Sequence, residues 1–276
     1  VDLYKSITTI FECKPVYFFQ YCVKMADENQ KNNREYYMGL KSYVESVVYP
    51  DFPYSHVYAI KEVVEKIPAD SILHLSINDS IRITNFFKLN PKIKTYANIG
   101  THGIDGCLSS FLGQAVAGNK QSYLVIGDLA FFYDMNAMRL RHIKNNVHIL
   151  LINNEGGSEF YFNHMWKDEA SDLHTTARHH TKAEGWVKSN DFIYLSAHDK
   201  ESMQKALKEF MRSDLDKPVF LEVFTEMKTD SDVIYDFFDL SRPKDIQSEA
   251  IRKSKEFIKA TIGQEKAQKI AGLFKK

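Results

Sequence analysis

Residues 122–157 read SYLVIGDLAFFYDMNAMRLRHIKNNVHILLINNEGG, and this stretch decides the fold class. Two short apolar runs, at 122–126 and 147–152, have the length of strands, and the spacing of apolar residues predicts a helix at 134–144 between them. Strands that are apolar on both sides and alternate with helices are typical of a parallel sheet covered on both faces. The stretch therefore predicts an α/β fold.

The same alternation continues on both sides of this stretch. Apolar residues at helical spacing predict helices at 56–67, 107–117 and 200–211. Apolar runs bounded by turn residues predict further strands at 71–77, near Tyr96 and at 218–224. We therefore expect one domain at 51–230, built on a doubly wound, mostly parallel sheet flanked by helices.

Two flanking segments lie outside this domain. Residues 1–50 contain an aromatic-rich stretch around Tyr17 that predicts a helix, but no complete core is visible in them. We expect them to be the remnant of a preceding domain and a linker. Residues 231–276 mix charged and apolar residues at helical spacing, which predicts a helical tail. Packing of this tail on its own domain is favoured over a partner or a membrane surface.

The composition excludes several classes of protein. The 276 residues include 36 Lys and Arg and 36 Asp and Glu, so the formal net charge of 0 provides no long-range attraction for nucleic acid. The apolar content of 44% is that of a folded globule. No apolar run approaches the ~20 residues of a membrane span, and the three cysteines form no CxxC pair. We therefore expect a folded cytoplasmic protein with no nucleic-acid or membrane partner.

Three polar or glycine-rich clusters follow predicted strands, at 98–106, 127–129 and 153–157. In open parallel sheets, ligands bind outside the carboxyl ends of the strands. Glycines allow the backbone to approach a ligand closely, and Asp128 with Asn154 provides the hard oxygen ligands that suit Mg²⁺. The combination predicts an anionic phosphate ligand held through a metal ion. Two other interpretations stay open, because Asp128 could cap a helix and 153–157 could form a tight turn.

These clusters resemble the motifs of a known family. Gly-Asp-Leu at 127–129 followed by Asn-Asn at 153–154 is similar to the diphosphate–magnesium motif of thiamine-diphosphate-dependent enzymes. More specifically, NIGTHGIDG at 98–106, GDLAFFYDMN at 127–136 and INNEGG at 152–157 resemble the 2-succinyl-5-enolpyruvyl-6-hydroxy-3-cyclohexene-1-carboxylate synthases of menaquinone biosynthesis. The fold expected from the strand pattern agrees with the C-terminal, diphosphate-binding domain that this resemblance implies.

The resemblance implies roles for individual residues. It assigns Mg²⁺ to the side chains of Asp128 and Asn154 and to the carbonyl of Gly156. It assigns to Ile104 the support of the bent conformation of thiamine diphosphate. The other cofactor-binding positions that it implies are Gly103, Gly127, Leu129, Ala130 and Gly157.

The activity implied by the resemblance is decarboxylation of a 2-oxoacid, 2-oxoglutarate, followed by addition of the resulting carbanion equivalent to isochorismate. Both substrates are anions, so an arginine is expected in the pocket, and Arg82 stands where the family has one. The other expected substrate-binding residues are Asn78, His102, Glu159 and Phe160.

Several of these positions depart from the family pattern. Ile99 stands where the family has an arginine, and Glu159 places a carboxylate where an apolar wall is usual. Asn78 and His102 each stand where the family has a serine or a similar small residue. Because losing a cation and gaining an anion disfavours a dicarboxylate, a thiamine-diphosphate-dependent decarboxylase or ligase for another 2-oxoacid stays open as an alternative.

The resemblance also implies a catalytic glutamate carried by an N-terminal, pyrimidine-binding domain of the same or a partner subunit. No such domain is recognisable in this sequence, while residues 1–15 resemble the last strand of the family's middle domain. We therefore expect a C-terminal piece that contains no complete catalytic set, is inactive alone and works within a homodimer or tetramer. A non-catalytic interaction paralogue is the remaining alternative.

Histidines cluster at His174, His179 and His180. Their spacing matches no zinc pattern, so we expect a solvated or substrate-facing loop there. His102 lies within the predicted cofactor turn, where a role close to the substrate and a structural hydrogen bond are both open.

Overall fold

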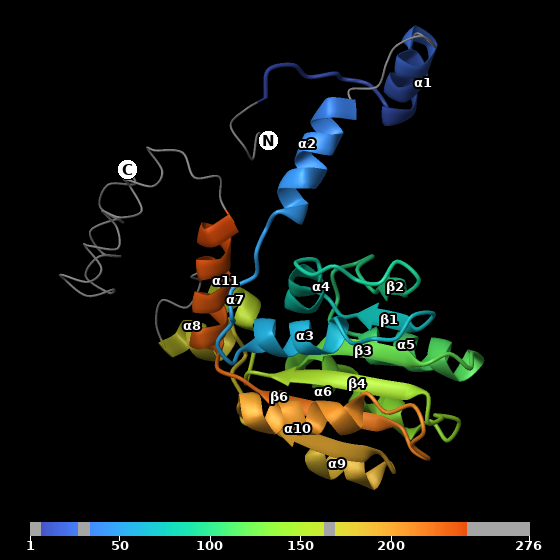
Figure 1. Cartoon of the computed structure of the whole chain (residues 1–276), viewed down its shortest axis with the longest axis vertical. Coiled ribbons are helices and arrows are strands. Elements are labelled where there is room, and N and C mark those ends of the chain that lie inside the picture. Colours follow the sequence, from blue (N-terminus) through green and yellow to red (C-terminus); the bar gives the residue numbers. More distant parts are fainter. Residues whose placement is uncertain (1–6, 27–33, 163–168, 242–276) are drawn as a thin grey trace, which may run out of the picture. The chain divides into compact units, whose positions relative to one another are not determined.

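A computed structural model describes residues 7–26, 34–162 and 169–241 of the chain (Figure 1). The chain divides into two compact units, 1–49 and 50–276. The first unit contains α1 (Pro15–Met25) and α2 (Arg34–Glu45), and neither helix has a buried residue. Among the described residues, no helix is both long and apolar enough to cross a membrane.

The second unit is built on a six-stranded sheet in which every neighbouring pair of strands is parallel. The strands are β1 (Ile72–Leu75), β2 (Lys94–Ala97), β3 (Ser122–Gly127), β4 (Val147–Asn153), β5 (Ile193–Ala197) and β6 (Val219–Phe224). Their order across the sheet is β2-β1-β3-β4-β6-β5. The chain leaves β1 toward β2 and then crosses to β3 on the other side, so the strand order reverses between β1 and β3, where such sheets form a ligand crevice.

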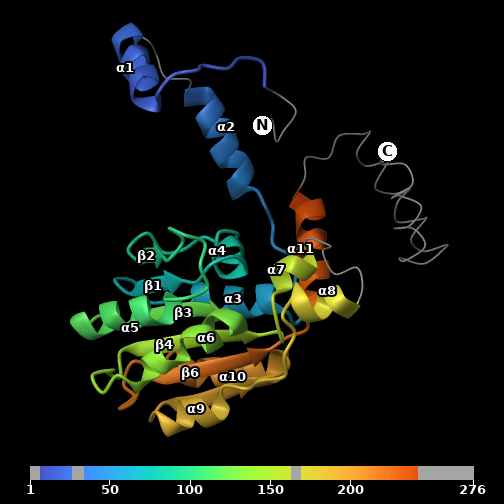
Figure 2. The same cartoon turned by 180° about the vertical axis from the view of Figure 1, so that it is seen from behind.

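Helices cover both faces of this sheet. They are α3 (His56–Val64), α4 (Asp79–Thr84), α5 (Cys107–Ala117), α6 (Asp128–Asp134), α7 (Ser158–Phe162), α8 (Glu169–His174), α9 (Glu184–Ser189), α10 (Lys200–Phe210) and α11 (Met227–Ser241). Figure 1 shows α3 and α10 in front of the sheet, and Figure 2 shows α5 and α6 on its other face. The fold is therefore the α/β class that the strand pattern predicts.

Local sequence explains why the central elements form. All seven residues of β4 are buried, as are the first five of β3, because both strands are covered by helices on both faces. Ser55 caps α3 by accepting a hydrogen bond from the backbone N–H of Tyr58, at 3.2 Å. These elements lie where the apolar runs and the cap residue predict them.

The structure corrects two predicted elements. The helix after β3 begins at Asp128 and ends as a 3₁₀ turn at Arg139, so the prediction of a helix at 134–144 is wrong. Gly127 is extended and the Asp128 carboxylate lies at the helix start, which allows the helix to begin directly after the strand. In the first unit, residues 7–14 form no strand, and no described neighbouring strand is available to pair with them.

One strand has no counterpart among the predicted elements, and the first helix of the expected tail begins earlier than predicted. The edge strand β5 is short and only partly buried, so it lacks the continuous apolar run that marks the central strands. Helix α11 begins before residue 231 and buries Val233, Ile234 and Phe237. Residues 242–276 of the expected helical tail lie outside the described residues.

Candidate diphosphate and cation site

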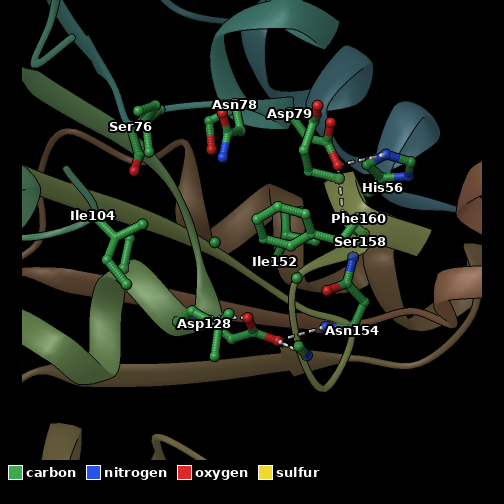
Figure 3. A pocket seen from close by; sticks show the side chains of 18 of the residues that line it. His56, Ser76, Asn78, Asp79, Ile104, Asp128, Ile152, Asn154, Ser158 and Phe160 are labelled. Atoms are coloured by element: carbon green, nitrogen blue, oxygen red, sulfur yellow. Dashed lines mark hydrogen bonds and ion pairs between the residues drawn. The ribbon is translucent and has the colours of Figure 1, made fainter. Parts of the chain in front are cut away.

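A cavity of about 300 Å³ lies at the carboxyl ends of β1, β3 and β4 (Figure 3). The predicted site residues that line it are Asn78, His102, Ile104, Gly127, Asp128, Leu129, Ala130, Asn154, Gly156, Gly157, Glu159 and Phe160. Gly103 and Arg82 do not line it. Residues from three separate loops therefore meet here because parallel strands bring their carboxyl ends to one edge of the sheet.

Asp128 is the buried acidic group of this cavity, with 2% of its surface exposed. Its Oδ2 accepts hydrogen bonds from the backbone N–H groups of Asn154, at 3.1 Å, and Gly156, at 3.0 Å. Nε2 of His179 lies 3.4 Å from the same oxygen, and this contact raises the pKa of His179. The carboxylate at the end of β3 thus fixes the loop that follows β4.

Asn154 presents its amide oxygen to the cavity. Its Nδ2 donates a hydrogen bond to Oδ2 of Asp230, at 3.0 Å. A carboxylate accepts but does not donate, so this contact identifies which end of the amide is the nitrogen. In Figure 3 the oxygen of Asn154 points away from that contact and into the cavity. No described residue donates a hydrogen bond to this oxygen.

The donor set at this edge fits a hard cation. Asp128 offers a carboxylate and Asn154 an amide oxygen, and Gly156, whose N–H donates to Asp128, carries the backbone carbonyl expected as a third ligand. Oxygen ligands of this kind suit Mg²⁺, which also keeps waters and phosphate oxygens in its shell. The described residues contain no group of three or more His, Cys, Asp or Glu side chains suited to a metal.

Of the expected substrate-binding residues, all but Arg82 line the cavity. Arg82, on α4, forms an ion pair with Glu159, on α7, and half of its side chain is exposed. Glu159 and Phe160 line the cavity from the start of α7. Asn78 and His102 also line it, and both have positive φ angles, of 61° and 55°. The predicted arginine is therefore at the rim, already paired with a carboxylate of the chain.

Gly103 is a turn residue beside the cavity. A Cβ at this position would lie 2.1 Å from Oδ1 of Asp105, so a larger residue here would displace the Asp105 side chain. Of the clustered histidines, His179 reaches the site through Asp128, whereas His180 is exposed and lies 3.2 Å from Oε1 of Glu155.

The polar residues of the site that have no counterpart among the predicted ones include His56, Asp79, Ser158 and Asp230. The first three line the cavity. Nδ1 of His56 lies 2.9 Å from Oδ1 of Asp230, and its Nε2 lies 3.9 Å from Oδ2 of Asp79. Ser158 donates a hydrogen bond from Oγ to the same oxygen of Asp79, at 2.5 Å (Figure 3).

His56 and Asp230 form a buried ion pair. Burial alone would lower the pKa of His56, but the charge and hydrogen bond of Asp230, together with Asp79, outweigh it and raise the pKa. Burial would likewise raise the pKa of Asp230, and the adjacent His56 lowers it instead. No local pattern reveals this pair, because 174 positions separate the two residues.

Comparisons with known proteins identify relatives. No protein-family model matches the chain. The 2-succinyl-5-enolpyruvyl-6-hydroxy-3-cyclohexene-1-carboxylate synthase of Phocaeicola vulgatus is 33% identical over 239 residues, which cover 86% of this chain and 42% of the relative. The synthases of Bacteroides fragilis and Bacteroides thetaiotaomicron are 34% and 33% identical, cover 86% and 88% of this chain, and are themselves covered to 43% and 44%.

The chain is homologous to part of this synthase family. The synthase homology confirms the resemblance expected from the motifs at 98–106, 127–136 and 152–157. The chain spans less than half of the length of the synthases that it matches, 42% to 44% in these three. The motifs at 127–136 and 152–157 contain Asp128, Asn154 and the neighbouring residues that line the cavity at the ends of β3 and β4.

Proposed function

We propose that this chain is the diphosphate- and Mg²⁺-binding part of a thiamine-diphosphate-dependent enzyme. The observation that carries the proposal is the convergence of Asp128, Asn154 and Gly156 at one edge of the sheet, in a chain homologous to 2-succinyl-5-enolpyruvyl-6-hydroxy-3-cyclohexene-1-carboxylate synthases. By this homology, the activity is decarboxylation of 2-oxoglutarate and addition of the product to isochorismate, a transferase step of menaquinone biosynthesis.

In this proposal the residues of the chain bind and orient the cofactor. Asp128 and Asn154 hold Mg²⁺ through side-chain oxygens, and Gly156 does so through its carbonyl. Ile104 and Ile152 provide apolar walls that keep water from the cavity. The positions left to line the diphosphate are Gly127, Leu129, Ala130 and Gly157, with Gly103 in the adjoining turn. Thiamine diphosphate, when bound, supplies the electron sink for decarboxylation of a 2-oxoacid.

The proposal includes partners for this chain. A pyrimidine-binding domain, from the same or a partner subunit, supplies the catalytic glutamate, and the assembly is a homodimer or tetramer in the cytoplasm. The homology to synthases of about twice the length supports a need for further domains.

Calorimetric titration of thiamine diphosphate with Mg²⁺ into the full chain tests the proposal. Asp128→Ala removes a cation ligand and the acceptor for two backbone N–H groups, so we expect Mg²⁺-dependent binding to weaken at least about tenfold. Asp51→Ala is the control, because Asp51 is exposed and pairs with Lys200, and it should bind normally. Equal binding by Asp128→Ala would contradict the assignment. No binding by the unmodified chain would favour a non-catalytic interaction protein.

A second candidate is a thiamine-diphosphate-dependent decarboxylase or ligase that uses a different 2-oxoacid. It is favoured by the carboxylates of Asp79 and Glu159, which line the cavity, and by the pairing of Arg82 with Glu159. The second carboxylate of a dicarboxylate substrate would meet like charges at this rim and an arginine that is already paired, whereas a monocarboxylate 2-oxoacid lacks that second charge. Binding of a panel of mono- and dicarboxylate 2-oxoacids separates the two candidates.

A further inference from the structure

Asp230 is a fully buried carboxylate on α11 that lies behind the cation-binding residues. Its four contacts come from three parts of the chain. Oδ1 accepts from the backbone N–H of His56, at 2.8 Å, and lies 2.9 Å from Nδ1 of the same residue. Oδ2 accepts from Nδ2 of Asn154, at 3.0 Å, and from Oγ1 of Thr225, at 2.7 Å.

The two oxygens of Asp230 face different kinds of donor. On the Oδ1 side, the backbone N–H of His56 is held by the start of α3 and can only donate. On the Oδ2 side, the Thr225 hydroxyl can rotate, and the Asn154 amide can turn its oxygen where its nitrogen was. The orientation of the Asn154 amide therefore depends on Asp230 having an acceptor on that side.

We propose that Asp230 is a positioning residue that keeps the amide oxygen of Asn154 directed at the cation. The inference rests on the proposed function, since it concerns the cation site of the same cavity. Partners of this kind orient a metal ligand without touching the metal, and removing one weakens metal binding by about 10- to 100-fold. Asp230 is 76 positions from Asn154 and does not line the cavity, so it can affect the cation only through residues such as Asn154 that do line it.

The substitution Asp230→Asn tests the orientation with little change in shape. The backbone N–H of His56 still requires an acceptor, so the introduced amide keeps its oxygen on that side and turns its NH₂ group toward Asn154. Asn154 then turns its own oxygen to that NH₂ group and its nitrogen to the cation. We expect Mg²⁺ binding in the presence of thiamine diphosphate to weaken about tenfold or more.

A charge swap provides the matching rescue. Asn154→Asp alone places a second carboxylate against Asp230, and we expect it to lower the melting temperature and to weaken Mg²⁺ binding. Combined with Asp230→Asn, the same substitution offers one oxygen to the introduced amide and one to the cation. We expect the double variant to bind Mg²⁺ within about threefold of the unmodified chain. Asn154→Asp would then weaken Mg²⁺ binding in the unmodified chain and strengthen it in the Asp230→Asn variant.

Mg²⁺ titrations of the full chain with thiamine diphosphate, together with melting temperatures, are the measurements. Thr225→Val is the control, because it removes a hydrogen bond to the same oxygen of Asp230 but not the contact with Asn154. It should lower stability and leave Mg²⁺ affinity unchanged. This inference alone is overturned if Asp230→Asn binds Mg²⁺ as tightly as the unmodified chain does. It is also overturned if the losses of Mg²⁺ affinity in Asp230→Asn and Asn154→Asp simply add in the double variant. No Mg²⁺-dependent binding by the unmodified chain overturns the proposed function and this inference with it.

Discussion

Gly156 shows how the absence of one side chain shapes the loop that carries the candidate cation ligands. Its φ angle is +151°, and a Cβ at this position would lie 2.7 Å from the carbonyl oxygen of Thr176. The next residue, Gly157, donates its backbone N–H to that same oxygen, at 2.6 Å. The loop after β4 therefore lies directly against the segment around Thr176, and the N–H of Gly156 donates to Oδ2 of Asp128, at 3.0 Å.

At this scale we predict that Gly156→Ala lowers the free energy of unfolding by about 1–3 kcal/mol, because the new Cβ meets fixed backbone and the φ angle is unfavourable for alanine. Urea unfolding measures the change. Gly113→Ala is the matched control, since Gly113 lies within α5 and a Cβ there would have no heavy atom within 4 Å. Alanine favours a helix over glycine by about 1 kcal/mol, so the control should not lose stability. Equal stability of Gly156→Ala and the unmodified chain would contradict the prediction.

Two side-chain pairs hold α4 and α7 together at the rim of the cavity. Ser158 donates to Asp79, at 2.5 Å, and Arg82 forms an ion pair with Glu159. Both residues of α7 lie in its first turn, so the helix that carries Phe160 is fixed to α4 at its start. The same contacts place the carboxylate of Glu159 next to the one arginine expected to meet a substrate.

Glu159→Gln tests what this carboxylate does to substrate choice. The neutral variant releases Arg82 for an anionic ligand, so we expect binding of the dicarboxylate 2-oxoglutarate to tighten about fivefold, as for an exposed ion pair worth about 1 kcal/mol. Binding of the monocarboxylate pyruvate should change less. Both ligands are titrated into the full chain with thiamine diphosphate and Mg²⁺.

Glu184→Gln is the control for Glu159→Gln, because Glu184 is an exposed carboxylate that pairs with Lys188 on α9. It should leave the affinities for both 2-oxoacids unchanged. An equal gain for 2-oxoglutarate and pyruvate in Glu159→Gln, or no gain for either, would show that the carboxylate has no part in selecting the substrate.

At the scale of the whole molecule, a buried histidine makes stability depend on pH. His148 lies in β4, its ring stacks on Tyr123 with 4.6 Å between centroids, and Nδ1 is 2.8 Å from the carbonyl oxygen of Phe210. Burial lowers the pKa of His148 to about 4, against the smaller opposing effect of the hydrogen bond with Phe210. The folded protein therefore holds this ring neutral at neutral pH.

We predict that the free energy of unfolding falls as the pH is lowered from 6.5 toward 4, because the unfolded chain gains a proton at His148 before the folded chain does. A shift from 6.5 to about 4 corresponds to about 3 kcal/mol. Urea unfolding at pH 7 and pH 4.5 measures the loss. His148→Gln has no ring to titrate, so its loss over this range should be smaller by about that amount. Parallel losses in both proteins would contradict the prediction.

Local sequence was sufficient for the buried central strands and for finding candidate site residues at their ends. Apolar runs mark β3 and β4 because both are buried on both faces, and Asp128 and Asn154 are identifiable because each follows such a run. The same reasoning failed for the helix at 134–144, since a helix that starts directly at Asp128 leaves no polar turn to mark its beginning. It also missed β5, whose partial burial gives no continuous apolar run.

By itself, the sequence determined the α/β class and the order of the central elements, and it led to the prediction that Asp128 and Asn154 hold a cation, because helix caps, strand burial and strand ends depend on neighbours a few residues away. Only the tertiary structure decided which groups the side chains of the site contact and how they are oriented. Asp230 orients Asn154 across 76 positions, and Glu159 pairs with Arg82 across 77. These contacts form because parallel strands bring distant loops to one edge of the sheet, and no local pattern records which loops will meet.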